Sequence, residues 1–480
     1  MFDGMDHFWA VVTIVGYLLT LLLVPYVLLQ QRKTPVSTLA WIMAIVIVPY
    51  AGSFLFLLFG INRVERRASL KLAARRQIDR LLPALTQYQV LPGEDFDAKV
   101  RRLVRLSDRL TQTRPCFGNA VEILSDTNRT LGLIEQAIGA AQESIHLEYY
   151  IFQPDRTGYK LRDLLIRKAA QGVRIRFLFD GVGSLFLGRK FLRPMRAAGI
   201  EVASALPGAS LRERWSINLR NHRKIVIVDG RIGFTGGMNI GDEYIGRNPR
   251  LGYWRDTHLR LAGPVVLQLQ QVFAEDWFFA TSQQLTDPRL FPAPQETSDQ
   301  VAQVIAGGPD GDTDVFHSLF FAAINEARDR ITLATSYFIP TPALITALEA
   351  AAHRGVRVRL MVPAFGDHRW MVTAGRGFYE SLLESGVELY EYRRGLLHSK
   401  TLTIDGHWSL VGSPNFDTRS LHLNFEVALA LFGPRQAQRL EEQFADDLTY
   451  SERVDLATFR QRPLVNKVAE QVLKLFAPIL

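Results

Sequence analysis

The chain has 480 residues, 48% of them hydrophobic, which is enough for two domains or more with sizeable cores. Its single cysteine, Cys116, excludes an intrachain disulfide, and we expect a small buried core residue there. The formal net charge of +8 indicates an anionic partner, which could be nucleic acid, phospholipid headgroups or a phosphorylated substrate.

Two uncharged apolar runs lie within the first sixty residues. They span residues 8–29 and 36–59, and each is long enough to cross a hydrocarbon core of about 30 Å. The sequence therefore predicts two transmembrane helices in an N-terminal segment, 1–62. A cleaved signal peptide is disfavoured, because Asp3 and Asp6 make the N-terminus acidic and a second apolar run follows.

A basic stretch follows the second apolar run. The basic residues between the two runs are Arg32 and Lys33. More basic residues follow the second run, at Arg63, Arg66, Arg67, Lys71, Arg75, Arg76 and Arg80. Because cytoplasmic flanks carry the excess of Lys and Arg, we expect the long C-terminal portion in the cytoplasm. Residues 63–110 are predicted as a basic helical segment, either on the membrane surface or as a solvated linker.

The remainder of the chain repeats itself in order. The matching pairs of segments are 131–152 with 318–340, 168–181 with 351–364, 196–202 with 383–389, 235–239 with 411–415 and 261–264 with 431–434. Helices alternate with β-branched strands in both halves, which predicts two α/β domains of one ancestry, at 111–285 and 301–463. The Pro-rich, polar stretch 286–300 is predicted as their linker.

One polar motif recurs in both halves, as NHRKIVIVDG and as LHSKTLTIDG. Its residues are His222, Lys224 and Asp229 in the first copy, and His398, Lys400 and Asp405 in the second. In a strand, residues two apart share a face, so each His points the same way as its Lys. Each Asp lies an odd number of positions from its His and directly precedes a Gly. We therefore expect it to hold the turn or pair at a distance, rather than orient that His.

Other polar residues recur at matching offsets. Asp256 and Glu426 each lie seven residues before a Gly, and a carboxylate that accepts one imidazole N–H would leave the other nitrogen free to attack. Asn239 and Asn415 each follow their motif His by seventeen residues, and Ser413 precedes the second of them. We expect these amide and hydroxyl groups to bind phosphate oxygens, because two buried lysines aimed at one pocket imply an anionic ligand.

The chain carries the motif HxKxxxxD twice, followed by GGxN in the first copy and by GSxN in the second. In this doubled motif it resembles the phospholipase D superfamily. The apolar N-terminus with LEYYIF, YWRDTHLRLAGP and YFIP is most similar to the bacterial cardiolipin synthases within it. The resemblance implies an α/β fold in which two duplicated phospholipase D-like domains form a pseudo-dimer behind two transmembrane helices. It also implies that both motifs meet at one cleft, without a metal or other cofactor.

The activity implied by the resemblance is phosphatidyl transfer between two phosphatidylglycerol molecules, with all six motif residues in the catalytic set. One imidazole, by resemblance His222, attacks phosphorus, and His398 protonates the departing glycerol and then activates the second lipid, although the two roles could be exchanged. Lys224 and Lys400 would stabilise charge. The products would be cardiolipin and glycerol.

The resemblance also implies partners and a location. The expected partners are phosphatidylglycerol and other anionic phospholipids, not nucleic acid, and the expected location is the bacterial cytoplasmic (inner) membrane, as a multi-pass protein. A hydrolytic phospholipase, a nuclease or a phosphatidylserine-type synthase of the same fold stays an alternative. A non-catalytic module that binds anionic lipid is a further one.

The C-terminal segment 464–480 is predicted to be an amphipathic helix. Its apolar residues recur at helical spacing, at Val465, Val468, Val472, Leu475, Phe476 and Ile479. Such a stripe either docks onto the protein core or lies on a membrane, and we expect the core.

Overall fold

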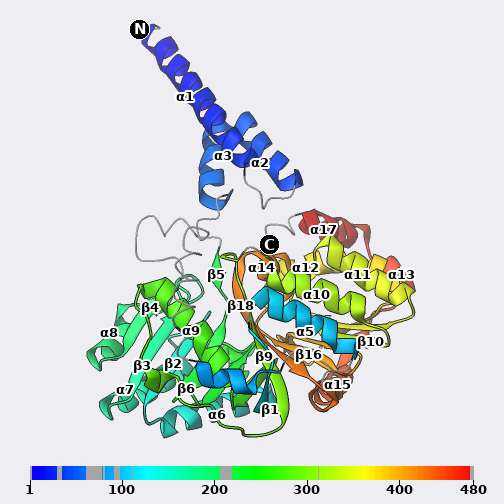
Figure 1. Cartoon of the computed structure of the whole chain (residues 1–480). Helices are drawn as coiled ribbons and strands as arrows, with labels where there is room; N and C mark the ends of the chain where they lie inside the picture. Colours follow the sequence, from blue (N-terminus) through cyan, green and yellow to red (C-terminus); the bar gives the residue numbers. More distant parts are fainter. Residues whose placement is uncertain are drawn as a thin grey trace. The chain divides into compact units, whose positions relative to one another are not determined.

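The computed structural model describes residues 3–29, 35–60, 78, 82–90, 98–111, 113–205, 219–311 and 313–475. They fall into two compact units (Figure 1). The smaller unit holds the N-terminal helices, and the larger unit holds the remaining described helices and the described strands.

The described residues of the N-terminal unit form four helical segments. They are α1 (Asp3–Leu28), α2 (Pro35–Ile47), α3 (Pro49–Leu55) and a π-helical turn (Phe56–Gly60). α1 packs against both α2 and α3. The basic positions predicted to set the membrane orientation, at 32–33, 63–76 and 80, lie outside the described residues.

The second predicted transmembrane helix is interrupted. Val48 has φ −130° and ψ 73°, outside the helical region, and Pro49 begins a new helix. Proline lacks the amide N–H that would continue the helix, and it disfavours the helical conformation in the residue before it. The prediction of one continuous helix over 36–59 is therefore wrong. Over the part of the chain that the structure describes, no helix combines the length and the apolarity needed to cross a membrane.

The larger unit contains two lobes with the same strand order. In the first lobe, β4, β3 and β2 are parallel, and β6, β7, β8 and β1 continue the sheet as antiparallel neighbours. The strands are β1 (Cys116–Asp126), β2 (Ser144–Tyr149), β3 (Arg174–Phe179), β4 (Glu201–Ser204), β6 (Lys224–Val228), β7 (Ile232–Gly236) and β8 (Tyr253–Ala262).

In the second lobe, β13, β12 and β10 are the parallel strands, and β15, β16, β18 and β9 follow as antiparallel neighbours. The strands are β9 (Gln300–Gly307), β10 (Arg330–Ala334), β12 (Arg357–Pro363), β13 (Glu388–Tyr392), β15 (Thr401–Ile404), β16 (Trp408–Gly412) and β18 (Asn424–Phe432), with β19 (Ser451–Arg453) added beside β13. The repeated order confirms the predicted α/β class and its internal duplication.

Helices cover both faces of each sheet. The first lobe has α6 (Thr127–Ala140), α7 (Arg156–Ala170) and α8 (Arg189–Ala197) on one face and α9 (Val265–Thr281) on the other. The second lobe has α5 (Ala98–Thr111), α10 (Val315–Glu326), α11 (Pro342–His353), α12 (Arg369–Arg376) and α13 (Tyr379–Glu384) on one face and α15 (Pro434–Leu448) on the other. The remaining described helices are α14 (Thr418–His422), α16 (Leu456–Arg460), α17 (Leu464–Leu475) and the 3-10 turns Pro83–Tyr88, Glu243–Ile245 and Pro288–Leu290.

Each lobe has a hydrophobic cluster of its own, and a third cluster is shared between the lobes. β1 pairs antiparallel with β9, which joins the two sheets edge to edge. A hydrophobic cluster containing α9 side chains includes residues of β8 from the first lobe and of β9 and β18 from the second. Cys116 lies fully buried in this cluster as a free thiol, as the sequence predicted.

Two short strands cross between the lobes. β5 (Arg220–Asn221) belongs to the first lobe but pairs with β18 of the second, whereas β14 (Gly395–Leu397) belongs to the second but pairs with β8 of the first. Each short strand leads directly into a His-x-Lys segment. The backbone of each motif is therefore attached to the opposite lobe.

The motif aspartates hold the hairpin turns. Asp229 and Asp405 have φ of 54° and 51°, and the next residue in each turn is a Gly with positive φ. The carboxylate of Asp229 accepts the backbone N–H groups of residues 142–144, and that of Asp405 accepts those of residues 328–330, all at 2.8–3.3 Å. This confirms the expectation that they hold local structure.

Replacing either aspartate should cost stability rather than chemistry. Asp229→Asn and Asp405→Asn each keep a side chain that tolerates positive φ but remove the charge that three amides share. We expect the free energy of unfolding to fall by about 1–3 kcal/mol, measured by urea unfolding. Asp299→Asn is the surface control. Loss of turnover with unchanged unfolding would contradict this role.

Candidate active site

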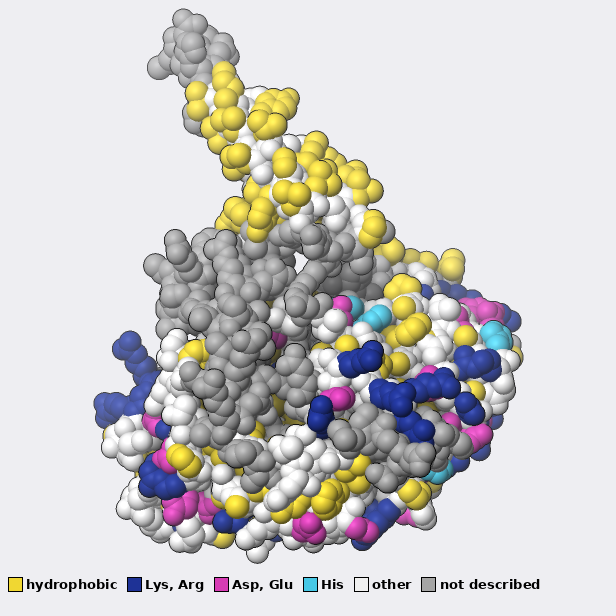
Figure 2. Space-filling view, in the orientation of Figure 1, with side chains coloured by type: hydrophobic (Ala, Val, Ile, Leu, Met, Phe, Trp, Pro, Cys, Tyr) yellow, Lys and Arg dark blue, Asp and Glu magenta, His cyan; other side chains and the backbone are white. Residues whose placement is uncertain are grey.

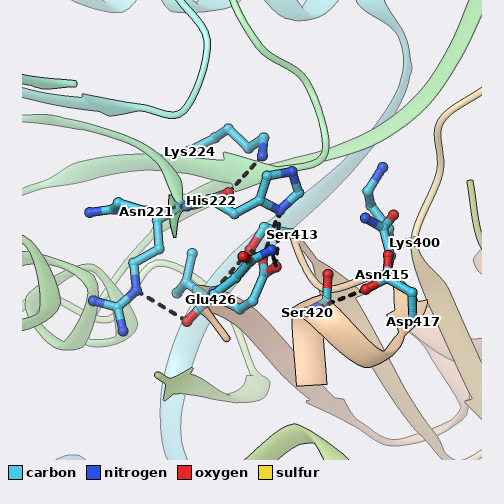
Figure 3. A network of polar contacts seen from close by, with 12 residues as sticks. Asn221, His222, Lys224, Lys400, Ser413, Asn415, Asp417, Ser420 and Glu426 are labelled. Carbon is cyan, nitrogen blue, oxygen red and sulfur yellow. Dashed lines mark hydrogen bonds and ion pairs between the residues drawn. The ribbon is translucent and has the colours of Figure 1, made fainter. Parts of the chain in front are cut away.

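His222 is held against a carboxylate of the second lobe. Its backbone N–H donates to the carbonyl of Phe425 at 2.9 Å, which places its imidazole beside the next residue, Glu426. Nδ1 of His222 lies 2.9 and 3.0 Å from the two carboxylate oxygens of Glu426. Ser413 and Asn424 also donate to this carboxylate, at 2.5 and 3.2 Å. Figure 3 shows the imidazole of His222 pointing at Glu426.

His398 has the reciprocal arrangement with the first lobe. Its backbone N–H donates to the carbonyl of Arg255 at 2.7 Å, and its Nδ1 lies 2.7 Å from Oδ2 of Asp256. Oδ1 of Asp256 accepts the backbone N–H of Thr257 at 2.7 Å. The sequence proposed Asp256 and Glu426 as orienting groups without assigning either to a histidine. The structure pairs each with the histidine of the other lobe.

Burial sets the protonation of these two pairs. It lowers the pKa of His222 to about 4 and also lowers the pKa of His398. Burial opposes charge on Glu426, but His222 and Lys224 outweigh it and hold its pKa at about 2, and His398 likewise keeps the pKa of Asp256 low. At neutral pH both imidazoles are therefore neutral, with Nδ1–H donated to a carboxylate and a lone pair on Nε2.

Both motif lysines are buried beside the histidines. Nζ of Lys224 donates to the carbonyl of His222 at 2.6 Å, and Nζ of Lys400 donates to the carbonyl of His398 and to Oγ of Ser336, both at 2.5 Å. Burial lowers the pKa of Lys224 to about 7 and that of Lys400 to about 8. The charge of Lys400 also lowers the pKa of Lys224 and of His222, so the two motifs act on one electrostatic environment.

The two motif asparagines use their carbonyl oxygens within their own lobes. Oδ1 of Asn239 accepts the backbone N–H of Ile151 at 3.2 Å, and Oδ1 of Asn415 accepts the hydroxyl of Ser336 at 3.0 Å. Ser336 thereby links Asn415 to Lys400. The structure places Asn415 beside Lys400, across from His222 in Figure 3.

Ser413 and its counterpart Gly237 make the lobes unequal. The hydroxyl of Ser413 donates to Glu426 and accepts the backbone N–H of Val427, so it supports the carboxylate that orients His222, and its contact with phosphate stays a prediction. A Cβ added to Gly237 would lie 2.1 Å from Oδ1 of Asp256, which leaves no room for a serine there. The longer side chain of Glu426 therefore accepts a hydrogen bond from Ser413, whereas the shorter side chain of Asp256 packs against Gly237.

Sequence reasoning missed Tyr150 and Ser336, which occupy matching positions in the repeated segments LEYYIF and SYFIP. Tyr150 packs its ring 4.9 Å from that of His222, and Nζ of Lys224 lies 5.4 Å from the same ring. In the second lobe, Ser336 takes this place and binds Lys400 directly. The repeat boundaries were the signal that could have identified both residues.

Arg223 was also missed, and it fastens the first motif to the second lobe. Its side chain donates to the carbonyls of Glu426 and Gly307, both at 3.1 Å, and forms a buried ion pair with Asp276. Truncating one partner of such a pair leaves an uncompensated buried charge, which is costly. Arg223 therefore fixes the position of its neighbour, His222.

Chemically, the site presents two neutral imidazoles and two ammonium groups to an anion. An imidazole Nε2 held by a carboxylate can attack an electrophile, and a second can move a proton. Among the residues that the structure describes, no group of three or more His, Cys, Asp or Glu side chains is arranged to hold a metal ion.

A family model described as cardiolipin synthase, phospholipase D-like domain matches the chain twice, at residues 134–277 and 320–448. A second model, described as the N-terminal segment of phospholipase D nucleases, matches residues 8–60. The two matches of the first model fall one in each lobe, and each contains one copy of the His-x-Lys motif.

Curated relatives match over nearly the whole chain. A cardiolipin synthase of Geobacillus thermodenitrificans is 37% identical over 95% of this chain and 91% of the relative. One of Alkalihalophilus pseudofirmus is 37% identical over 99% of this chain and 96% of the relative. A crystal structure of phosphatidylserine synthase from Haemophilus influenzae, 14% identical, superposes with a TM-score of 0.62 over 79% of this chain and all of that chain, which shows a shared fold.

Gly237→Ala tests the support of Asp256. The added methyl collides with the carboxylate that holds His398, so we expect turnover of a phosphodiester to fall about 10- to 100-fold, as for other groups that position a catalytic side chain. Gly139→Ala is the matched control, because nothing lies within 4 Å of a Cβ at that helical position. Full turnover in the Gly237 variant would contradict the positioning role of Asp256.

Proposed function

The chain belongs to the cardiolipin synthase family of phospholipase D-like proteins, and from this premise we propose that it makes cardiolipin. It is a phosphatidyltransferase that moves a phosphatidyl group from one phosphatidylglycerol to another and releases glycerol. The observation that carries the proposal is the crossed pairing of two neutral imidazoles with two buried carboxylates, beside two buried ammonium groups.

In the first step, Nε2 of His222 attacks the phosphorus of phosphatidylglycerol. A nitrogen–phosphorus bond forms, and the bond from phosphorus to the glycerol oxygen breaks. The bound phosphodiester adds negative charge beside His398 and Asp256, which favours the imidazolium form of His398. His398 then gives its Nε2 proton to the departing glycerol oxygen, and Glu426 stabilises the positive charge that develops on His222.

In the second step, His398 acts as the base. Its Nε2 takes the proton of a hydroxyl on a second phosphatidylglycerol, whose oxygen attacks phosphorus while the nitrogen–phosphorus bond breaks. One phosphodiester replaces another, so the reaction lies near energetic balance and runs in both directions. Splitting one displacement into two steps lets the same pair of histidines serve both.

The lysines supply the charge stabilisation. Lys224 and Lys400 place their ammonium groups where the non-bridging phosphate oxygens gain charge, in a site with little water to screen them. Asn415 positions Lys400 through Ser336, and Asn239 holds the backbone at Ile151, beside Tyr150. Water that reaches the intermediate would instead release phosphatidic acid, so exclusion of water separates a transferase from a hydrolase.

The protein works at the bacterial cytoplasmic membrane, with its catalytic unit on the cytoplasmic side. Support comes from the N-terminal unit, where α1 exposes large apolar side chains such as Ile14, Tyr17, Leu21 and Leu22. The basic positions that follow this unit in the sequence favour the cytoplasmic side. Both lipid substrates are found in the membrane that these side chains would contact.

The products identify the reaction. Purified protein in detergent, given phosphatidylglycerol labelled in its phosphate and headgroup, should yield labelled cardiolipin and free glycerol. His222→Ala and His398→Ala should each lower the rate about 10²- to 10⁴-fold, because each removes a reacting group. His353→Ala, an exposed histidine on α11, is the matched control and should keep the full rate. Phosphatidic acid as the sole lipid product would establish a hydrolase instead.

Rapid quenching tests the covalent step. The phosphatidyl label should be recovered on the peptide that contains His222, with the acid lability of a phosphoramidate. Recovery on the peptide that contains His398 would overturn the assignment of roles.

The lowered pKa values of the two lysines predict that kcat/KM falls at alkaline pH. With pKa values of about 7 for Lys224 and about 8 for Lys400, both ammonium groups are charged below these values and lose charge as the pH rises through them. We therefore expect kcat/KM to fall as the pH rises through 7 to 8, and to fall at the acid end near pH 4, where His222 gains a proton.

A Lys224→Arg variant should move the alkaline fall to higher pH, toward the pKa of Lys400, in whatever activity remains, because a guanidinium keeps its charge. Lys160→Arg, at an exposed position on α7, should leave the profile unchanged. An unmodified protein whose kcat/KM stays constant to pH 10 would contradict the assigned role of the lysines.

A further inference from the structure

α17 is amphipathic, but it turns its polar face to the protein. Glu470 is only 3% exposed and pairs with Arg462 at 2.7 Å. Lys474 donates to the carbonyl of Gly377 at 2.8 Å, and Lys467 also bonds to a backbone carbonyl. A helix that docks on a protein core has the opposite polarity. The expectation that the apolar stripe of this segment docks onto the core is therefore wrong.

The apolar stripe of α17 faces outward. Val465, Val468, Val472 and Leu475 are spaced three, four and three residues apart, and they are 78%, 53%, 46% and 77% exposed. Figure 2 shows hydrophobic side chains on the surface where Figure 1 places α17. The polar contacts on the inner face fix the helix in this orientation, so the exposed stripe is a built feature of the fold. Phe476 and Ile479 lie outside the described residues.

A short chain of contacts connects α17, which carries this stripe, to the active site. α17 packs against α12, and the loop before α12 carries Asp367. The carboxylate of Asp367 accepts the hydroxyl of Tyr337 at 2.7 Å, and Tyr337 directly follows Ser336, which binds Lys400. α12, the loop before it and Tyr337 therefore connect α17 to Ser336 and Lys400.

Exposed apolar side chains also lie in the segments that follow the equivalent strands β3 and β12 of the two lobes. Leu185 and Phe186 follow β3 and are 71% and 72% exposed, whereas Phe365 and Trp370 follow β12 and are about two-fifths exposed. The first pair is tied to the site, because the neighbouring Ser184 donates its hydroxyl to the carbonyl of Tyr150 at 2.9 Å. We call these four side chains, with the outward face of α17, the apolar rim.

Basic side chains accompany the apolar rim. Arg189, Lys190 and Arg193 follow Phe186 along the chain, and Arg369 precedes Trp370; all four are exposed, and none forms an ion pair with another described residue. Exposed apolar side chains flanked by cations are typical of surfaces that bind anionic lipid at the headgroup level. A water-exposed protein surface gains nothing from such a combination.

We propose that the apolar rim inserts into the headgroup region of an anionic phospholipid bilayer and holds the mouth of the active site against it. This is a membrane contact of the catalytic unit itself, separate from the N-terminal helices. Its benefit to turnover rests on the proposed function: lipid substrates reach the two histidines laterally, without crossing water. The binding itself needs no chemistry and is tested on its own.

A fluorophore on α17 reports the contact directly. Val468→Cys is labelled with an environment-sensitive dye in the full chain, where the native Cys116 is fully buried and does not react. The protein is reconstituted into phosphatidylglycerol vesicles that contain lipids with spin-labelled acyl chains. We expect strong quenching at position 468 and none at the matched control, Gln438→Cys, which is exposed on α15.

Equal, weak quenching at positions 468 and 438 would overturn the proposal. So would a dye at 468 that is shielded from both spin-labelled lipid and aqueous iodide, because another part of the chain or a second copy would then cover the stripe. Because this readout needs no turnover, it stays valid even if the protein does not make cardiolipin.

Turnover provides the second arm. The double variant Val468→Asp, Val472→Asp should lower the rate on phosphatidylglycerol vesicles about tenfold or more, since it replaces apolar groups that partition into lipid with charges. Its rate on water-soluble, short-chain phosphatidylglycerol should be unchanged. Gln438→Asp is the control. An unchanged rate on vesicles, or an equal loss on both substrates, would contradict a role for the rim in lipid access.

Discussion

Each motif histidine in this fold contacts a carboxylate from the opposite lobe. His222 meets Glu426, and His398 meets Asp256, because short strands carry each motif across the lobe boundary. A buried carboxylate without a cationic or donor partner is expensive, so the two lobes stabilise one another through the same contacts that prepare the site. Separated lobes would each retain a histidine and an acid, but in neither would the two meet.

Duplication preserved the geometry of the two half-sites but not their chemical detail. In one half, the longer Glu426 is supported by the hydroxyl of Ser413, and in the other Gly237 leaves room for the shorter Asp256. An aromatic ring packs on His222, where the equivalent place in the other lobe holds a hydroxyl that binds a lysine. The two imidazoles therefore have different surroundings, which fits the proposed mechanism, in which one attacks phosphorus and the other moves protons.

The burial that prepares the site also makes it sensitive to water and to charge. Desolvation keeps the imidazoles neutral and lowers the pKa of both lysines, so an anion bound beside the lysines would stabilise their charged forms. In the proposed mechanism, water must be excluded until a second lipid reaches the covalent intermediate. A catalytic unit held on a bilayer by the exposed apolar face of α17 would receive its anionic substrates from the lipid side. The same contact would keep water away from the site.

The sequence by itself determined the α/β class, the duplication, the motif residues and the turn role of the two aspartates, because periodicity, glycine positions and repeat spacing are local properties. It also identified Asp256 and Glu426 as acids at matching offsets. Only the tertiary structure decided which histidine each acid serves, since strand pairing between lobes is not written in spacing. The tertiary structure also showed that the second apolar run is interrupted at Pro49 and that the apolar stripe of α17 is exposed. The exposed side of a helix depends on which of its sides makes contacts in the folded chain.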